Sequence, residues 1–162
     1  MLSFCYNGVG IKANIMTKIF IGSDHGGYNL KEKIKEVFSK LGYEFEDVGT
    51  NSLDSCDYPV YAEKVAQKVL ETDGLGILVC GTGIGMSIVA NKFKGIRASH
   101  CTDTFSARMT KEHNNSNILC LGERITGQDL ALDIVKIWLE TPFSNGERHQ
   151  KRLDLIKAIE NK

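Results

Sequence analysis

The first candidate for chemistry is a glycine-rich segment that begins with a cysteine, Cys80-Gly-Thr-Gly-Ile-Gly-Met-Ser87. Glycine recurs at positions 81, 83 and 85, where the chain passes from an apolar run into a helical pattern. Bare backbone N–H groups in such a loop can converge on an anion, and the helix dipole adds to the attraction. The alternative is a tight turn, but a turn alone normally needs only one glycine. The pattern therefore favours an oxyanion site.

Cys80 stands at the last position of the apolar run, immediately before the glycines. A thiol close to a helix N-terminus is more readily ionised, and the thiolate is its reactive form. The alternative is a small buried residue that closes a core strand. We assign that simpler role to Cys101 and Cys120, because no glycine loop follows them.

Two other pairs of polar residues could act on a small polar substrate. Asp24-His25 could hydrogen-bond to sugar hydroxyls or a phosphate, or could cap a helix. His113-Asn114 could supply a general acid or base, since histidine suits proton transfer near neutral pH, or could end a helix as its C-cap.

A pair of arginines offers a phosphate site. Arg148 and Arg152 are four residues apart, so both guanidinium groups project from one helical face. With no acid opposite them, they suit a phosphate better than a surface ion pair. The alternative is a solvated basic face that Lys151 shares.

Neither glycine loop carries a nucleotide-binding motif. Gly22–Gly27 lacks the G-x-G-x-x-G spacing, and in Cys80–Ser87 the third glycine of that fingerprint would fall on Met86 or Ile88. A Walker-type loop requires G-K-[ST], and no lysine follows the glycines before Lys92. The two nucleotide motifs are thus excluded.

Strand and helix patterns alternate from Lys18 onward. Short β-branched or apolar runs predict strands at Lys18–Gly22, Tyr43–Val48, Gly76–Cys80, Ile96–Ser99 and Ile118–Leu121. Helical spacing predicts buried stripes at Leu30–Leu41, Ala62–Val69 and Leu130–Trp138, and further helices from the glycine loop to about Lys92, at Thr104–His113 and at Glu147–Ile159.

This alternation predicts a three-layer α/β/α, Rossmann-like domain with a five-stranded parallel sheet and an extra C-terminal helix. Ligands bind such folds beyond the carboxyl ends of the strands, where the strand order reverses. We therefore expect Gly22–Gly27 and Cys80–Ser87 to face one site. The domain is expected to span residues 16–162, after a poorly ordered extension of residues 1–15 that fits neither a signal nor a transit peptide.

Composition narrows the class of protein. The 162 residues are 42% hydrophobic and 25% charged, with 20 Lys and Arg against 20 Asp and Glu. A neutral chain has no field that gathers nucleic acid or an anionic membrane, and no apolar run is long enough to span a bilayer. Five cysteines without a C-x-x-C pair indicate reduced thiols in a cytoplasmic protein. A small-molecule enzyme is the default class.

Seven short motifs follow one another from about Lys18 to the C-terminus. They are S-D-H-x-G at Ser23–Gly27, D-Y-P at Asp57–Pro59, C-G-T-G-x-G at Cys80–Gly85, A-N-K-F-x-G-I-R-A at Ala90–Ala98, H-N-x-S-N at His113–Asn117, L-G-x-R at Leu121–Arg124 and G-E-R-H-x-x-R at Gly146–Arg152. Taken together, these motifs resemble one enzyme family, type B ribose-5-phosphate isomerase, which also includes allose-6-phosphate and galactose-6-phosphate isomerases.

The resemblance implies interconversion of ribose 5-phosphate and ribulose 5-phosphate in the pentose phosphate pathway, without metal or organic cofactor. It implies that Cys80 is the base, that His113 opens the sugar ring, and that Thr82 and the loop N–H groups stabilise an enediolate. The implied substrate-binding residues are Asp24, His25, Tyr58, Gly81, Gly83, Ile84, Gly85, Asn114, Arg124, Arg148 and Arg152. Of these, Arg124 is expected from a neighbouring subunit.

Some family members use a glutamate in the glycine loop as the base. Here Ile84-Gly85-Met86 contains no acid, so the cysteine variant applies. Two alternatives stay open. One is a hexose-6-phosphate isomerase, which would use the same base and cradle. The other is a non-catalytic phosphosugar-binding protein on the same fold.

We also predict a homodimer, or a tetramer, with active sites at the subunit interface. Cys80 and Asp24 follow adjacent strands at the expected reversal of strand order. His113 and Arg124 are expected from outer strands, so a two-fold partner would bring its copies across to complete the pocket.

Overall fold

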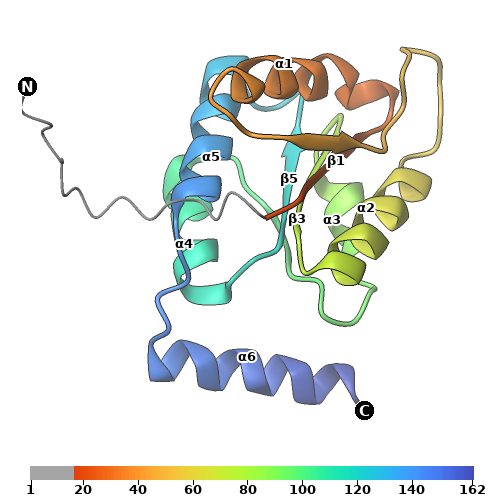
Figure 1. Cartoon of the computed structure of the whole chain (residues 1–162). Coiled ribbons are helices and arrows are strands. Elements are labelled where there is room, and N and C mark those ends of the chain that lie inside the picture. Colours follow the sequence, from red (N-terminus) through yellow and green to blue (C-terminus); the bar gives the residue numbers. More distant parts are fainter. Residues whose placement is uncertain (1–16) are drawn as a thin grey trace, which may run out of the picture.

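The computed structural model describes residues 17–162, and the predicted extension of residues 1–15 lies outside this range. A five-stranded sheet forms the middle layer (Figure 1). Its strands are β1 (Ile19–Ser23), β2 (Phe45–Asp47), β3 (Leu75–Cys80), β4 (Ala98–His100) and β5 (Ile118–Gly122). They lie in the order β2-β1-β3-β5-β4, and every neighbouring pair is parallel. The predicted fold class is confirmed.

The helices follow the strands as predicted, with ends shifted by a few residues. They are the short 3-10 turn η1 (His25–Gly27), α1 (Tyr28–Ser39), α2 (Tyr58–Thr72), α3 (Ile84–Ala90), α4 (Thr104–Asn114), α5 (Gln128–Glu140) and α6 (Glu147–Glu160). Pro59 occupies the first turn of α2, where its missing N–H costs nothing.

Alternate residues of a strand point to opposite sides of the sheet, so both faces of this sheet are apolar. Helices cover both of them. Ile21 and Val79 join the core beneath α1, α4 and α5. Phe20 and Leu78 join the core beneath α2 and α3. The central strands β1, β3 and β5 are buried almost throughout, as their unbroken apolar sequences predict.

The strand order reverses between β1 and β3. β1 pairs with β2 on one side and with β3 on the other, so the chain turns in opposite directions after these two strands. Their carboxyl ends lie side by side, with Ser23 paired to Val79. This is the place where the sequence predicts a ligand site.

The prediction for Leu41 is wrong. The helical spacing placed it on the buried stripe of the first helix, but its side chain is 62% exposed. Helix α1 ends at Ser39, and the N–H of Tyr43 bonds to the carbonyl of Phe38 across a turn that contains Gly42 at φ 91°. The turn breaks the helical period before Leu41, and the Tyr43 ring packs against Phe38 instead.

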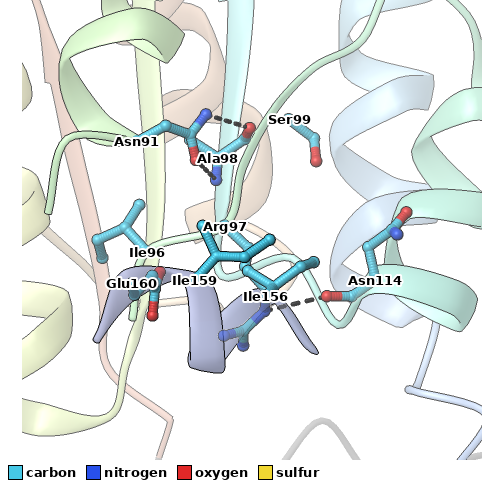
Figure 2. Close-up of a pocket in the computed structure, with 9 residues that line it drawn as sticks. All are labelled: Asn91, Ile96, Arg97, Ala98, Ser99, Asn114, Ile156, Ile159 and Glu160. Atoms are coloured by element: carbon cyan, nitrogen blue, oxygen red, sulfur yellow. Dashed lines mark hydrogen bonds between the residues drawn. The ribbon is translucent and has the colours of Figure 1, made fainter. Parts of the chain in front are cut away.

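Helix α6 stands apart from the two helical layers, below the sheet in Figure 1. A cavity of about 360 Å³ separates it from the start of β4. Figure 2 shows its lining, which is made of Asn91, Ile96, Arg97, Ala98, Ser99, Asn114, Ile156, Ile159 and Glu160. Within it, the Asn91 amide bonds to both backbone groups of Ala98. The glycine loop does not line this cavity.

A buried lysine on α4 yields a stability prediction. Lys111 is only 7% exposed, and its Nζ lies 4.7 Å from the centre of the Trp138 ring. Burial, with a smaller effect of Arg97, lowers the pKa of Lys111 to about 8. The unfolded chain binds this proton more tightly, so stability should rise with pH between about 8 and the ordinary lysine value. Below that window the full cost of burying the charge applies.

We therefore expect Lys111→Met to stabilise the protein at pH 7 by on the order of 1–2 kcal/mol, which is the cost of the buried charge less the lost cation–π contact and the lost hydrogen bond from Nζ to the Ser116 carbonyl at 3.4 Å. Urea unfolding at pH 7 and pH 10 measures the effect, which should be smaller at pH 10. Lys136→Met on α5, where the lysine is exposed, is the control. A Lys111→Met variant less stable than the wild type at pH 7 would contradict the prediction.

Candidate active site

The glycine loop joins the end of β3 to the start of α3, and its glycines are needed for different reasons. Gly83 has φ 78°, which favours glycine, and a Cβ there would lie 2.7 Å from the His100 ring. A Cβ on Gly85 would lie 2.8 Å from the ring of Tyr58. The turn thus requires glycine at position 83. Glycine at position 85 leaves room for the ring of Tyr58, a predicted substrate-binding residue, to lie against the loop.

The Cys80 sulfur lies within reach of this loop. Its side chain is 5% exposed, and the backbone N–H of Gly83 donates to Sγ at 3.0 Å. The N–H of Ile84 lies 3.4 Å from the Thr82 hydroxyl. Cys80 also packs in the core beneath α2 and α3, so both roles considered for it are compatible.

The two other buried thiols, Cys101 and Cys120, have raised pKa values. Burial and the charge of Asp103 raise the pKa of Cys101 to about 11. Burial, together with Cys80 and Cys101, raises the pKa of Cys120 well above its ordinary value. Both side chains are at most 2% exposed, as expected for core cysteines.

Asp24 and His25 lie at the neighbouring strand end. The Asp24 carboxylate accepts from the Gly26 N–H at 2.9 Å, so it caps the short turn η1, which was the alternative considered for it. The Nδ1 of His25 accepts from the N–H of Cys56 at 3.2 Å. A neutral His25 ring must then carry its proton on Nε2. Cys56 is a contact that the sequence analysis missed, because only the fold brings its loop to η1.

Arg124 differs from its predicted place. Its N–H donates to the carbonyl of Gly81 at 3.0 Å, and a Cβ on Gly81 or on Gly26 would lie 3.3 or 3.5 Å from its guanidinium. The structure therefore places Arg124 against both loops of its own chain, after a strand that lies inside the sheet and is not an outer strand. The reason is that β5, which Arg124 follows, pairs directly with β3.

A second group of candidate residues forms where α4 meets α6. The rings of His113 and His149 lie 4.2 Å apart between centres. The Nε–H of Arg148 donates to His149 Nε2 at 3.1 Å. Arg152 lies one turn further along α6 and, like Arg148, is exposed. The C-cap of α4 is Asn115, at φ 46°, rather than the predicted alternative His113-Asn114.

The group around Cys80 lies at the carboxyl ends of the strands, and the group around His113 lies at their amino ends. Cys80 ends β3 and pairs with Gly122 at the carboxyl end of β5. The Asn114 carbonyl accepts from the Nε–H of Arg97, which precedes β4 at the amino edge. A strand of five residues spans roughly 15 Å, so one chain does not bring Cys80 to His113. His113 lies in the last turn of α4, as the predicted helix Thr104–His113 implies, and not on the outer strand from which it was also expected.

No group of three or more histidine, cysteine, aspartate or glutamate side chains in residues 17–162 has the arrangement of a metal site. Among the helices in this same range, none is both long and apolar enough to cross a bilayer.

Comparison with known proteins places this chain in a family. The family described as Ribose/Galactose Isomerase matches residues 19–156. The chain belongs to this family. The resemblance inferred from the motifs is confirmed, and the chain is an isomerase.

Members of the ribose/galactose isomerase family match almost end to end. Ribose-5-phosphate isomerase B of Escherichia coli is 47% identical over 149 residues, which are 91% of this chain and 99% of that protein. The solved ribose-5-phosphate isomerase B of Clostridium thermocellum is 53% identical with a TM-score of 0.87, covering 90% and 98% of the two chains. That of Mycoplasma genitalium, solved with bound ribulose 5-phosphate, is 39% identical with a TM-score of 0.87, covering 91% and 98%.

Proposed function

We propose that this chain interconverts ribose 5-phosphate and ribulose 5-phosphate through an enediolate. The observation that carries the proposal is the Cys80 sulfur, which receives the Gly83 N–H inside a glycine loop at the reversal of strand order. The names of the Escherichia coli relative and of the ribulose-5-phosphate-bound Mycoplasma genitalium structure support the substrate. The free thiols at Cys56, Cys80, Cys101 and Cys120 fit a reducing cytoplasm.

In the proposed reaction, the Cys80 thiolate takes the proton from C2 of the open-chain aldose. The electrons of that C–H bond form the C1–C2 double bond, and the C1 carbonyl oxygen becomes negative. The loop N–H groups and the Thr82 hydroxyl stabilise this oxyanion. A proton moves from the C2 hydroxyl to the C1 oxygen, and Cys80 returns its proton to C1, which leaves the ketone at C2.

The remaining candidate residues bind and open the sugar in this proposal. His113 moves the proton that opens the furanose ring. Asp24 and Asn114 orient hydroxyls, and Tyr58 lines the sugar site against Gly85. The phosphate-binding side chains are His25, Arg124, Arg148 and Arg152.

A second copy of the chain completes the site in this proposal. Cys80 and His113 occupy opposite edges of one chain, so a site that uses both needs the His113 edge of a partner. Exposed apolar side chains on the glycine-loop side fit such an interface, since Ile84, Ile88 and Ile125 are 50%, 55% and 51% exposed. A homodimer, or a tetramer built from it, follows.

A coupled assay tests the substrate. Ribose 5-phosphate, allose 6-phosphate and galactose 6-phosphate should be compared at equal concentration, in buffer with EDTA. We expect the highest kcat/KM with ribose 5-phosphate. A preference for a hexose phosphate would instead support the hexose isomerase alternative, and binding without turnover of any sugar would support a binding protein.

Replacing the arginines of α6 tests the phosphate site. We expect Arg148→Ala or Arg152→Ala to raise KM by on the order of tenfold to a hundredfold, the loss of a charged hydrogen bond. kcat should change much less, because the phosphate is held equally in ground and transition states. Lys151→Ala, exposed on the same helix, is the control. Unchanged KM in both arginine variants would make these arginines a solvated basic face.

A further inference from the structure

His149 lies between two of the candidate residues but has no role in the proposed reaction. It is the third residue of α6 and is 6% exposed, whereas its neighbours Arg148 and Gln150 are exposed. Its ring stacks on the His113 ring, with 4.2 Å between centres and 35° between planes. A buried histidine on an otherwise exposed helix turn needs a physical reason.

Both ring nitrogens of His149 are occupied. The Nε–H of Arg148 donates to Nε2 at 3.1 Å, and a guanidinium cannot accept a hydrogen bond, so Nε2 carries no proton. The proton of the neutral ring is therefore on Nδ1, which lies 2.8 Å from the Ser144 hydroxyl oxygen. That oxygen also lies 3.3 Å from the N–H of Gly146, which fits its role as acceptor.

The surroundings also keep this ring neutral. Burial lowers the pKa of His149, and the nearby His113, Arg148 and Arg152 lower it further, against Glu112, which raises it. Protonation would break the hydrogen bond from Arg148 and place a second cation beside it. His149 is thus unsuited to proton transfer and suited to hold its neighbours.

We propose that His149 is a positioning residue that joins the ring-opening histidine to the phosphate-binding arginine. Its ring face holds the His113 imidazole, and its Nε2 holds the Arg148 guanidinium. This inference rests on the proposed function. In the proposed reaction His113 acts on the sugar ring and Arg148 binds the phosphate. A rigid link between them through His149 therefore fixes the distance between the two sites that bind a pentose phosphate.

Two substitutions separate the two contacts. His149→Phe keeps a flat ring against His113 but removes both hydrogen bonds. His149→Gln removes the ring, but its amide oxygen can still accept from Arg148, in place of Nε2.

We expect His149→Phe to raise KM about tenfold, as for a lost hydrogen bond to a charged group, with kcat changed much less. We expect His149→Gln to lower kcat from ribose 5-phosphate by on the order of tenfold, because His113 is misplaced. The same loss should appear from ribulose 5-phosphate, because the His113 that opens the ring of the aldose also closes it in the reverse direction. Gln150→Ala, whose amide bonds only to Asp154 in the described residues, is the matched control.

A spectroscopic measurement on the wild-type protein tests the tautomer directly. The imidazole ¹⁵N signals of the wild-type protein should show His149 with its proton on Nδ1 at pH 7.5, assigned by their loss in His149→Phe. A proton on Nε2 would overturn the inference.

The kinetic outcomes are equally decisive. If the wild type is active but the two variants change kcat and KM in the same proportions, or not at all, His149 positions neither neighbour. If the wild type isomerises no sugar phosphate, the proposed function fails and the positioning role fails with it, while the ¹⁵N result still decides the tautomer.

Discussion

Cys80→Ala should keep its fold and lose on the order of 10²–10⁴ in kcat, the usual contribution of a positioned general base. The Gly83 N–H that now donates to Sγ would face a methyl group, but the backbone of the loop would not need to change. Steady-state kinetics with ribose 5-phosphate measure the loss, and circular dichroism with thermal melting checks the fold. A folded alanine variant with near-wild-type turnover would rule out Cys80 as the base.

Alkylation supplies an independent measurement of the same residue. Iodoacetamide should modify Cys80 before Cys101 and Cys120, because burial raises the pKa of both of the latter and leaves less thiolate. Cys56 is more exposed than these three, and Cys5 lies outside the described residues. Both should first be replaced by serine, so that neither competes for the reagent. A saturating phosphosugar should protect Cys80. Labelling of Cys101 ahead of Cys80 would argue against a reactive thiolate in the glycine loop.

A mixture of two inactive variants should regain activity. Cys80→Ala and His113→Ala are each expected to be nearly inactive alone. Unfolded and refolded together in equal amounts, they should form about half heterodimers by random pairing. If Cys80 of one subunit works with His113 of the other, each heterodimer has one doubly damaged site and one intact site. Roughly a quarter of wild-type activity should return by the same two-fold pairing.

The control is each variant refolded alone, which should stay inactive. Heterodimers should be counted directly, with a charge tag on one variant and ion-exchange separation. If heterodimers form and activity stays at the level of the separate variants, the shared site is wrong. In that case Cys80 would have to work without the partner's copy of His113, although the two residues lie at opposite edges of one chain.

Much of the fold was predictable because it depends on local patterns. Alternating strand and helix periods predict an α/β domain, and glycine at alternate positions after β3 predicts the loop beside Cys80. Leu41 marks the limit of that reasoning. Its spacing fits the stripe of α1, but a backbone turn at Gly42 ends the helix first, and the apolar contact goes to Tyr43.

Patterns along the chain were sufficient to identify the residues of the loop, the order of the elements and the family that their motifs resemble. Which of these residues lie at the same end of the strands depends on the tertiary fold. Local periodicity does not say that β5 inserts between β3 and β4, and this insertion is what brings Arg124 to its own chain's glycine loop. A helix that connects two parallel strands runs antiparallel to them, so α4 carries His113 to the amino ends of the strands. There the His149 ring of α6 stacks on the His113 ring. Strand order and helix return are set by long-range packing, and no spacing along the chain records them.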